Sequence, residues 1–439
     1  MRITEKLTVK DRLISFEVFP PKTDSAFDSI ERSVRELSAF NPDFMSVTYG
    51  AGGGTSQYTT KIASLIKNRL DTTALAHLTC ASTPKETINI ILDTLKENHI
   101  DNILAMRGDI PAGEKVDTYT DAATGVTVYS LYGKNKKPSA EMLKDVDVLV
   151  YDIQDNGCRS FTFISTMGLC MEACAENGKE FMVLDRPNPL SGLKVEGNLV
   201  EDGFYSLVSQ FKIPYLYGLT PGELALMLND GMLKDGKKTK LTVVPMTGWH
   251  RYMTFDQTGM PWILPSPHQP YPQSAIYYPT TGIIGELYFV SIGVGYTMPF
   301  QLICASWIDA NEFCKRLNAL NLKGIDFRPI HIKPYYSVGK GENLQGVQLY
   351  VTDVLDCELT MVQFHAMEIL AEMYPDKRLL DEDGQGTLGN RWNMFDKVCG
   401  TDQIRVKFSK NYKVADIIDY WNKDVEAFKA KSAKYYLYN

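Results

Sequence analysis

The first third of the chain alternates short apolar runs with longer amphipathic segments. Short apolar runs predict strands, and apolar positions three or four residues apart predict helices. The predicted strands are 13–18, 44–49, 73–80 and 102–106, and the predicted helices are 25–40, 57–70 and 84–98. Thr83, Pro84 and Glu86 form a helix-start signal, with a capping residue, a proline in the first turn and an acid three positions after the cap. Strands that alternate with helices predict a parallel sheet with right-handed crossovers.

The alternation continues beyond residue 120 and then changes character. Strands are predicted at 126–131, 146–151 and 181–184, and helices at 139–143 and 163–177, with Gly178 as the stop of the second helix. Later elements are a helix at 221–229, capped by Thr220 and Glu223, a strand at 241–245 and a last helix at 414–431. We therefore expect an α/β fold. A mostly parallel, Rossmann-like sheet flanked by helices should span residues 11–204, followed by a smaller α+β domain.

The bulk composition narrows the function classes. A net charge of −7 argues against nucleic acid as a partner. The eight cysteines include no CxxC pair, so we expect reduced thiols and no metal site. No apolar run approaches the ~18 residues of a membrane helix. Residues 1–12 are charged and lack the apolar core of a secretory signal, which predicts a cytoplasmic protein. The sequence sets no oligomeric state.

Three motifs near the N-terminus, taken together, indicate a possible active site. They read SFEVFPP at 15–21, SVTYGAGGGT at 46–55 and AHLTC at 76–80. In this order they resemble the start of methylenetetrahydrofolate reductase, a flavin enzyme on a (β/α)8 barrel. The resemblance implies an acid toward folate at Glu17, and further cofactor- or folate-site residues at Thr48, His77, Arg107, Gly108 and Asp109. It covers residues 1–114, a partial barrel, so FAD is expected only if this part is functional.

A second set of motifs lies further along the chain. It includes YDIQD at 151–155, LDRPNP at 184–189 and WILPSP at 262–267. These motifs resemble the DUF1343 family, which includes exo-β-N-acetylmuramidases that act on peptidoglycan fragments. The resemblance implies that 115–204 completes a Rossmann-like domain and that 205–439 forms the α+β domain. It also implies a glycoside hydrolase without a cofactor, a small carbohydrate or muropeptide as substrate, and a family that is often exported.

Glycoside cleavage needs an acid that protonates the leaving oxygen and usually a second carboxylate. The catalytic candidates are Glu114, Asp152, Asp155 and Asp185. The substrate-binding candidates are Arg159 and Arg186 for a lactyl carboxylate, Trp249 and Trp262 for sugar faces, and Asn188 and Gln269 for hydroxyl or acetamido groups. Purely structural roles remain as alternatives to these functional ones. Asp185 and Arg186 can form an ion pair, the two tryptophans can be core residues, and Asp155 can be a turn residue.

The chain departs from the second family where the two resemblances meet. Family members carry a Pro-Glu-His-Gly stretch whose glutamate is thought to be catalytic, and the corresponding residues here are Asn102-Ile103-Leu104-Ala105. Loss of a general acid typically costs ~10²–10⁴ in rate. Strand 102–106 is expected to take the place of a lost family strand and to pair with 126–131. We predict a muramidase-type scaffold with impaired activity. The alternatives are an incomplete FAD-dependent folate reductase and a non-catalytic muropeptide-binding protein.

Overall fold

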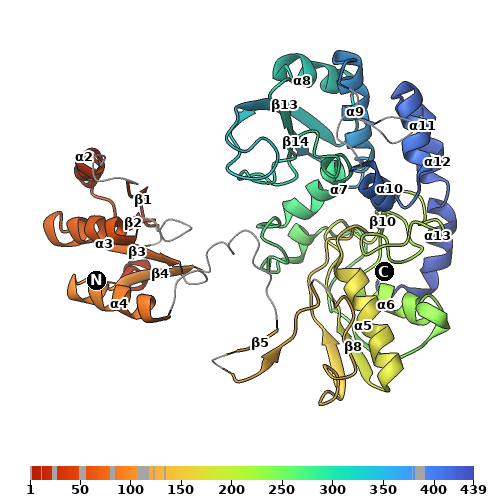
Figure 1. The fold of residues 1–439 in the computed structure, drawn as a ribbon, viewed down its shortest axis with the longest axis horizontal. Coiled ribbons are helices and arrows are strands. Elements are labelled where there is room, and N and C mark those ends of the chain that lie inside the picture. Colours follow the sequence, from red (N-terminus) through yellow and green to blue (C-terminus); the bar gives the residue numbers. More distant parts are fainter. Residues whose placement is uncertain are drawn as a thin grey trace. The chain divides into compact units, whose positions relative to one another are not determined.

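The structure is a computed structural model that describes residues 2–10, 12–21, 27–48, 56–79, 85–106, 118–121, 124–132, 135–377, 379–380 and 391–439. The chain forms two compact units, Met1–Val116 and Asp117–Asn439, called the N-terminal unit and the C-terminal unit below. Figure 1 shows the N-terminal unit in red to orange and the C-terminal unit from orange, at β5, to blue.

The N-terminal unit contains one parallel sheet in the order β1-β2-β3-β4. Its strands are β1 (Ser15–Val18), β2 (Phe44–Val47), β3 (Ala74–Thr79) and β4 (Asn102–Met106). Its helices are α1 (Ile3–Leu7), α2 (Phe27–Ser38), α3 (Ser56–Ser64), which continues as a wider helical turn over Leu65–Arg69, and α4 (Lys85–Glu97). The predicted strands and helices of this part are present, with ends that differ by a few residues. Thr83 and Pro84 lie outside the described residues.

The helices of this unit bury one face of the sheet. Val18, Met45 and Ala76 on the strands form a common core with Val34 of α2 and Ile62 of α3. Right-handed crossovers between consecutive parallel strands place the connecting helices on the same face, which explains this arrangement. Among the described residues, none on the opposite face belongs to that core.

The C-terminal unit contains a second parallel sheet, in the order β11-β8-β7. Its strands are β7 (Val148–Tyr151), β8 (Glu180–Leu184) and β11 (Lys240–Val244). The helices α5 (Phe163–Asn177) and α6 (Pro221–Asn229) pack on this sheet in one core. Helix α6 begins as predicted, because the Thr220 hydroxyl accepts the N–H of Glu223 at 3.2 Å and the Glu223 carboxylate accepts the N–H of Thr220 at 3.1 Å. Gly178 ends α5 in the left-handed conformation, with φ of 63°.

The C-terminal unit also contains an antiparallel sheet in the order β12-β14-β13 (Figure 1). Its strands are β12 (Leu302–Ala305), β13 (Ile325–Ile332) and β14 (Leu344–Val351). The remaining helices of the unit are α7 (Gln273–Gly285), α8 (Ala310–Ala319), α9 (Met361–Met373), α10 (Trp392–Cys399), α11 (Gln403–Asn411), α12 (Ile418–Asn422) and α13 (Val425–Ser432). Short 3-10 turns cover Lys234–Gly236, Phe255–Thr258, Val414–Asp416 and Ala433–Tyr435. In the part of the chain that the structure describes, no helix has the length and apolar character needed to cross a membrane.

The α/β class with parallel sheets is confirmed, but the expectation of one sheet across residues 11–204 is wrong. Within the described residues, β4 pairs with β3 alone. The predicted strand 126–131 shrinks to β6 (Thr127–Val128), which pairs with β5 (Tyr119–Thr120). Val126 and Tyr129 are exposed, so this segment buries no apolar face that would fix it in a larger sheet. The expected pairing of 102–106 with 126–131 therefore does not form. A second short antiparallel pair joins β9 (Val195–Glu196) to β10 (Leu216–Tyr217).

Two predicted helices also differ. Residues 140–145 form turns, in which the N–H of Leu143 bonds to the carbonyls of Ser139 and Ala140. Such a short segment has too few hydrogen bonds to offset the cost of helix nucleation. The predicted last helix at 414–431 is divided into a turn, α12 and α13. At the break, the Asp424 carboxylate accepts the N–H of Leu199 at 3.0 Å, a tertiary contact that interrupts the local periodicity.

Candidate functional site

The loops after β7 and β8 lie at one edge of their sheet. The two strands pair in parallel over four positions. Carboxyl ends of neighbouring parallel strands meet at the same edge, where such sheets usually bind ligands. Asp152 and Asp155 follow β7, and Asp185 follows β8. The structure thus brings three of the predicted acids to one edge, whereas Glu114 lies outside the described residues.

Asp152 and Arg186 form an ion pair across this edge. Nε of Arg186 donates to Oδ1 of Asp152 at 2.7 Å. The Asp152 side chain is 48% exposed and the Arg186 side chain 22% exposed. The terminal nitrogens of Arg186 have no hydrogen-bond partner among the described residues. The ion pair with Asp185 that the sequence left open does not form, because Arg186 offers that carboxylate only its backbone N–H, at 3.0 Å.

Asp155 is buried in the turn that follows β7. Its Oδ2 accepts the N–H of Gly157 at 2.9 Å and the hydroxyl of Tyr217. Its Oδ1 has no hydrogen-bond partner among the described residues. Burial raises the pKa of Asp155 to about 6, although the hydrogen bonds from Tyr217 and Gly157 act in the opposite direction. Asp155 is therefore a turn residue and also a carboxyl group that changes protonation near neutral pH.

Gly157 allows the two loops to approach each other. Its φ is 77°, and a Cβ at this position would lie 2.4 Å from Oδ1 of Asn188. Asn188 is buried, donates its side-chain N–H to the carbonyl of Leu219 at 3.0 Å and accepts the N–H of Leu190 at 3.0 Å. Both ends of the amide are used within the protein. Asn188 thus shapes the loop, and its substrate contact stays a prediction.

Asp185 is held by four donors. Its Oδ1 accepts the N–H of Gly222 at 2.7 Å and that of Arg186 at 3.0 Å. Its Oδ2 accepts the hydroxyl of Thr220 at 2.7 Å and that of Tyr438 at 2.6 Å. Burial raises the pKa of Asp185, with the hydrogen bonds opposing that change. Because each oxygen already has two donors, Asp185 anchors the start of α6 and has little freedom to transfer a proton to a substrate.

Arg159 does not face a ligand. It is 1% exposed. Its terminal nitrogens donate to four backbone carbonyls, those of Asn198, Ile213, Val398 and Cys399. Burial lowers its pKa to about 10. All terminal N–H groups are used inside the protein, so the predicted contact with a lactyl carboxylate is not available to this side chain.

The tryptophan candidates pack against other aromatic rings. Trp249 is buried and contacts Tyr438 edge to face, with ring centroids 5.0 Å apart. Trp262 is half-buried, contacts Phe255 edge to face at 4.7 Å and donates to the carbonyl of Gln269 at 2.9 Å. Gln269 is buried, and neither polar atom of its side chain has a partner among the described residues. Trp249 is therefore a core residue, Trp262 is partly exposed, and Gln269 keeps unpaired polar atoms inside the protein. The substrate contacts of Trp262 and Gln269 stay predictions.

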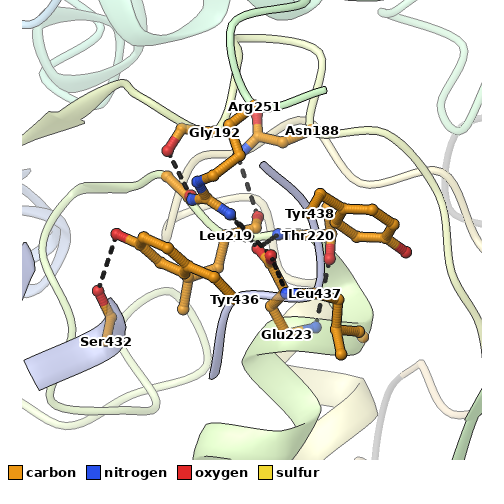
Figure 2. Close-up of polar contacts among 12 residues, drawn as sticks. Asn188, Gly192, Leu219, Thr220, Glu223, Arg251, Ser432, Tyr436, Leu437 and Tyr438 are labelled. Atoms are coloured by element: carbon orange, nitrogen blue, oxygen red, sulfur yellow. Dashed lines mark hydrogen bonds and ion pairs between the residues drawn. The ribbon is translucent and has the colours of Figure 1, made fainter. Parts of the chain in front are cut away.

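An ion pair between Arg251 and Glu223, which no sequence motif indicated, lies at the start of α6 (Figure 2). Nη1 of Arg251 lies 2.7 and 2.8 Å from the two carboxylate oxygens of Glu223. The ring of Tyr436 lies 3.5 Å from the guanidinium carbon of Arg251, and the N–H of Leu437 donates to Glu223 at 2.9 Å. Glu223 was recognisable as a helix-start residue, but no local signal connects it with Arg251, because the two are distant in sequence.

Of the candidate cofactor- and folate-site residues in the N-terminal unit, the described structure brings only Glu17 and His77 close together. Nε2 of His77 lies 3.9 Å from Oε1 of Glu17. Burial lowers the pKa of His77, with Glu17 opposing that change, which favours the neutral ring. Thr48 directly follows β2. Arg107, Gly108 and Asp109 lie outside the described residues.

Among the described residues, the sheet of this unit has four strands, whereas a barrel site draws side chains from strand ends around a closed ring. Glu17 is exposed, whereas His77 is buried. That FAD binds if this unit is functional stays a prediction. No group of three His, Cys, Asp or Glu side chains in the described part of the chain is arranged to hold a metal ion.

Comparison with known proteins finds two families. Models for the N-terminal and C-terminal parts of exo-beta-N-acetylmuramidase NamZ match residues 75–273 and 276–438, and a methylenetetrahydrofolate reductase model matches residues 2–131. The peptidoglycan beta-N-acetylmuramidase NamZ of Bacillus subtilis is 42% identical over 76% of this chain and 77% of its own length. The 5,10-methylenetetrahydrofolate reductase of Escherichia coli is 39% identical over 23% of this chain and 34% of its own length.

Solved structures give the same result for the larger part. The crystal structure of a DUF1343 family protein from Bacteroides fragilis is 51% identical, has a TM-score of 0.70, and covers 83% of this chain and 93% of its own. A second DUF1343 protein from that organism is 25% identical, has a TM-score of 0.57, and covers 88% of this chain and 98% of its own. Both family models match residues 75–131, so the two resemblances overlap across β3 and β4.

Proposed function

Because the chain belongs to the exo-β-N-acetylmuramidase NamZ family, we propose that its C-terminal unit is a glycoside hydrolase scaffold for peptidoglycan fragments. The glycosidase relative aligns with 76% of the chain, whereas a reductase relative aligns with 26% of it. This difference favours a glycosidase over a folate reductase. The proposed ligand is a fragment that ends in a β-linked N-acetylmuramic acid unit, cleaved by water without a cofactor.

The proposed site is the carboxyl edge of β7 and β8, and the Asp152–Arg186 pair carries the proposal. Asp152 holds Nε of Arg186 at 2.7 Å and leaves the terminal guanidinium nitrogens without a partner among the described residues. A guanidinium group binds a carboxylate through two parallel hydrogen bonds. N-acetylmuramic acid carries a lactyl carboxylate, which Arg186 is placed to bind.

The two acids of the β7 loop are the proposed catalytic groups. Asp152 is exposed, and Asp155 follows it by three positions with a pKa raised to about 6. Glycosidases generally use two carboxyl groups, one of which carries a proton at the working pH. Asp185 is a weaker choice, because four donors hold it at the start of α6.

A non-catalytic muropeptide-binding protein is the second candidate. The family resemblance implies that Ile103 replaces a catalytic glutamate. At the carboxyl edge of β7 and β8, Asp152 is exposed, whereas Asp155 is buried. Binding through Arg186 would persist even where proton transfer is lost.

Titration calorimetry with a muropeptide and hydrolysis of a chromogenic β-N-acetylmuramide test the proposal together. Arg186→Ala should weaken binding ~10–100-fold, the effect of losing charge-assisted hydrogen bonds. Arg328→Ala, which removes an exposed arginine on β13, is the matched control and should bind as the unmodified protein does. If both variants bind alike, Arg186 is not part of the site. Binding with release of muramic acid supports the hydrolase, and binding without release supports the second candidate.

A further inference from the structure

Helices α2, α3 and α4 cover one face of the N-terminal sheet, and α1 contacts its β4 end, where the N–H of Ile3 donates to Oδ1 of Asn102 at 2.9 Å. The four parallel strands of the sheet run in consecutive order, and Val18, Met45, Val47 and Ala76 bury their side chains against the helices. Sheets of this winding close into eight-stranded barrels, with helices outside and the other face lining the interior. Four strands supply half of that number.

The register defines the second face, called the open face below. One row across the four strands consists of Glu17, Ser46, Leu75 and Asn102. His77 and Leu104 are opposite each other in the next row on this face. The 3.9 Å distance between His77 and Glu17 agrees with this assignment. On this face Ser46 and His77 are buried, whereas Leu104 is 42% exposed, so the uncovered part lies at β4.

Both edges of this sheet are unpaired among the described residues. β1 pairs with β2 alone, and β4 pairs with β3 alone. An unpaired edge presents N–H and C=O groups that bind another strand. Ile103 and Leu104 on β4 are exposed, so the described chain itself leaves this edge accessible.

The strands are staggered in the way that barrel closure requires. In the row through Glu17, that residue is the third of β1, Leu75 is the second of β3 and Asn102 is the first of β4. Strand starts thus move along the strand direction from β1 to β4 without reversing. A closed barrel needs a cumulative shift of this kind, on the order of one residue per strand.

We propose that two copies of this chain associate through their N-terminal units and close an eight-stranded parallel barrel. β4 of each copy pairs with β1 of the other around a two-fold axis that runs along the barrel. This symmetry keeps all strands parallel and uses each open edge once, so that no edge remains. A second copy supplies the four missing strands with the matching stagger, and its two edges are complementary to those of the first copy. An unrelated partner would need the same strands, stagger and edges. The open face, including Leu104, becomes the barrel interior. The proposal is independent of the glycosidase site.

Sedimentation velocity of the full chain over a dilution series tests this association. Leu104→Lys places a charge in the proposed interior, and Ile90→Lys makes the same change at an exposed position on α4. We expect the unmodified protein and Ile90→Lys to form dimers, and Leu104→Lys to sediment as a monomer. Circular dichroism of both variants should match that of the unmodified protein, since Leu104 and Ile90 are exposed in the single chain.

Amide hydrogen exchange locates the interface. Dimer formation should protect backbone amides of β1 and β4, and Leu104→Lys should remove that protection. A protein that stays monomeric at all concentrations overturns the proposal. So does a dimer that survives Leu104→Lys, one that Ile90→Lys also disrupts, or one that leaves the β1 and β4 amides unprotected.

Discussion

Tyr438 donates its hydroxyl to Oδ2 of Asp185 at 2.6 Å and so fixes the carboxyl end of β8 to the C-terminal residues. The same hydroxyl accepts the N–H of Met246 at 2.9 Å, just beyond β11. Asp185 also holds the start of α6 through Thr220. The C-terminal segment therefore stabilises the strand ends from which the candidate site is built, although it supplies no candidate residue itself.

Tyr438→Phe tests this anchoring role. The substitution keeps the ring contact with Trp249 but leaves the buried carboxylate of Asp185 with one donor fewer. We expect the free energy of unfolding to fall by about 1–3 kcal/mol, the usual cost of an unsatisfied buried polar group. Urea denaturation measures it. Tyr435→Phe removes an exposed hydrogen bond to Asp230 and should cost no more than about 0.5 kcal/mol. Equal losses in the two variants would argue against a special role for the Asp185 contact.

The buried Arg251–Glu223 pair should be far more sensitive than exposed pairs. Arg251→Met leaves Glu223 charged and buried with few remaining donors, which typically costs about 3–5 kcal/mol. Arg316→Met breaks an exposed pair with Glu312 and should change stability by less than about 0.5 kcal/mol. Both values come from chemical denaturation at the same pH. A small effect of Arg251→Met would mean that water reaches Glu223.

Asp155 should make stability depend on pH. A carboxyl group whose pKa is higher in the folded state binds more protons when folded, so stability is lost as pH rises from about 4 to about 6. Asp155→Asn removes this effect and keeps an oxygen to accept from Tyr217 and Gly157. The unfolding free energy of the unmodified protein minus that of Asp155→Asn should therefore fall by roughly 2–3 kcal/mol between pH 4 and pH 7. Asp419→Asn, at an exposed position, is the control. A difference that stays constant with pH would show that Asp155 titrates normally.

Ile103→Glu should not restore glycosidase activity. The substitution returns an acid to the position that the family resemblance implies, but Ile103 lies in one row with Ala76 of β3, whose side chain packs against the helices of the N-terminal unit. A general acid contributes ~10²–10⁴ in rate only from a position within reach of the leaving oxygen. We expect chromogenic β-N-acetylmuramide to be turned over equally slowly by Ile103→Glu and by Ile103→Gln. A rate increase of ~10² or more in the glutamate variant alone would show that an acid at position 103 takes part in catalysis.

The local signals in the sequence predicted most elements correctly because they depend on short-range physics. Thr220 and Glu223 start α6, and Gly178 ends α5, through backbone contacts within one helical turn. The apolar runs that became β7 and β8 also identified the strand ends that bear Asp152 and Asp185. The predicted single sheet failed at 126–131, where a short alternating pattern did not reveal that only two residues pair and that the rest is exposed.

The roles of individual side chains needed the tertiary structure. Three arginines that the sequence does not distinguish have different partners. Arg159 binds four backbone carbonyls, and Arg251 is paired with Glu223. Arg186 bonds to Asp152 through Nε only. Asp155 and Asp185 likewise differ through burial and through distant partners such as Tyr217 and Tyr438. Motifs placed these residues at strand ends but could not show which of them keep hydrogen-bonding groups for a ligand.

By itself, the sequence determined the α/β class, the join between two families and the set of strand-end candidates, because periodicity and motifs are local properties of the chain. Only the tertiary structure decided that the chain forms two separate parallel sheets, that Asp185 and Arg159 are held from within, and that Asp152 and Arg186 meet. Those outcomes depend on desolvation and on contacts between residues far apart in sequence, whose energies no short segment contains.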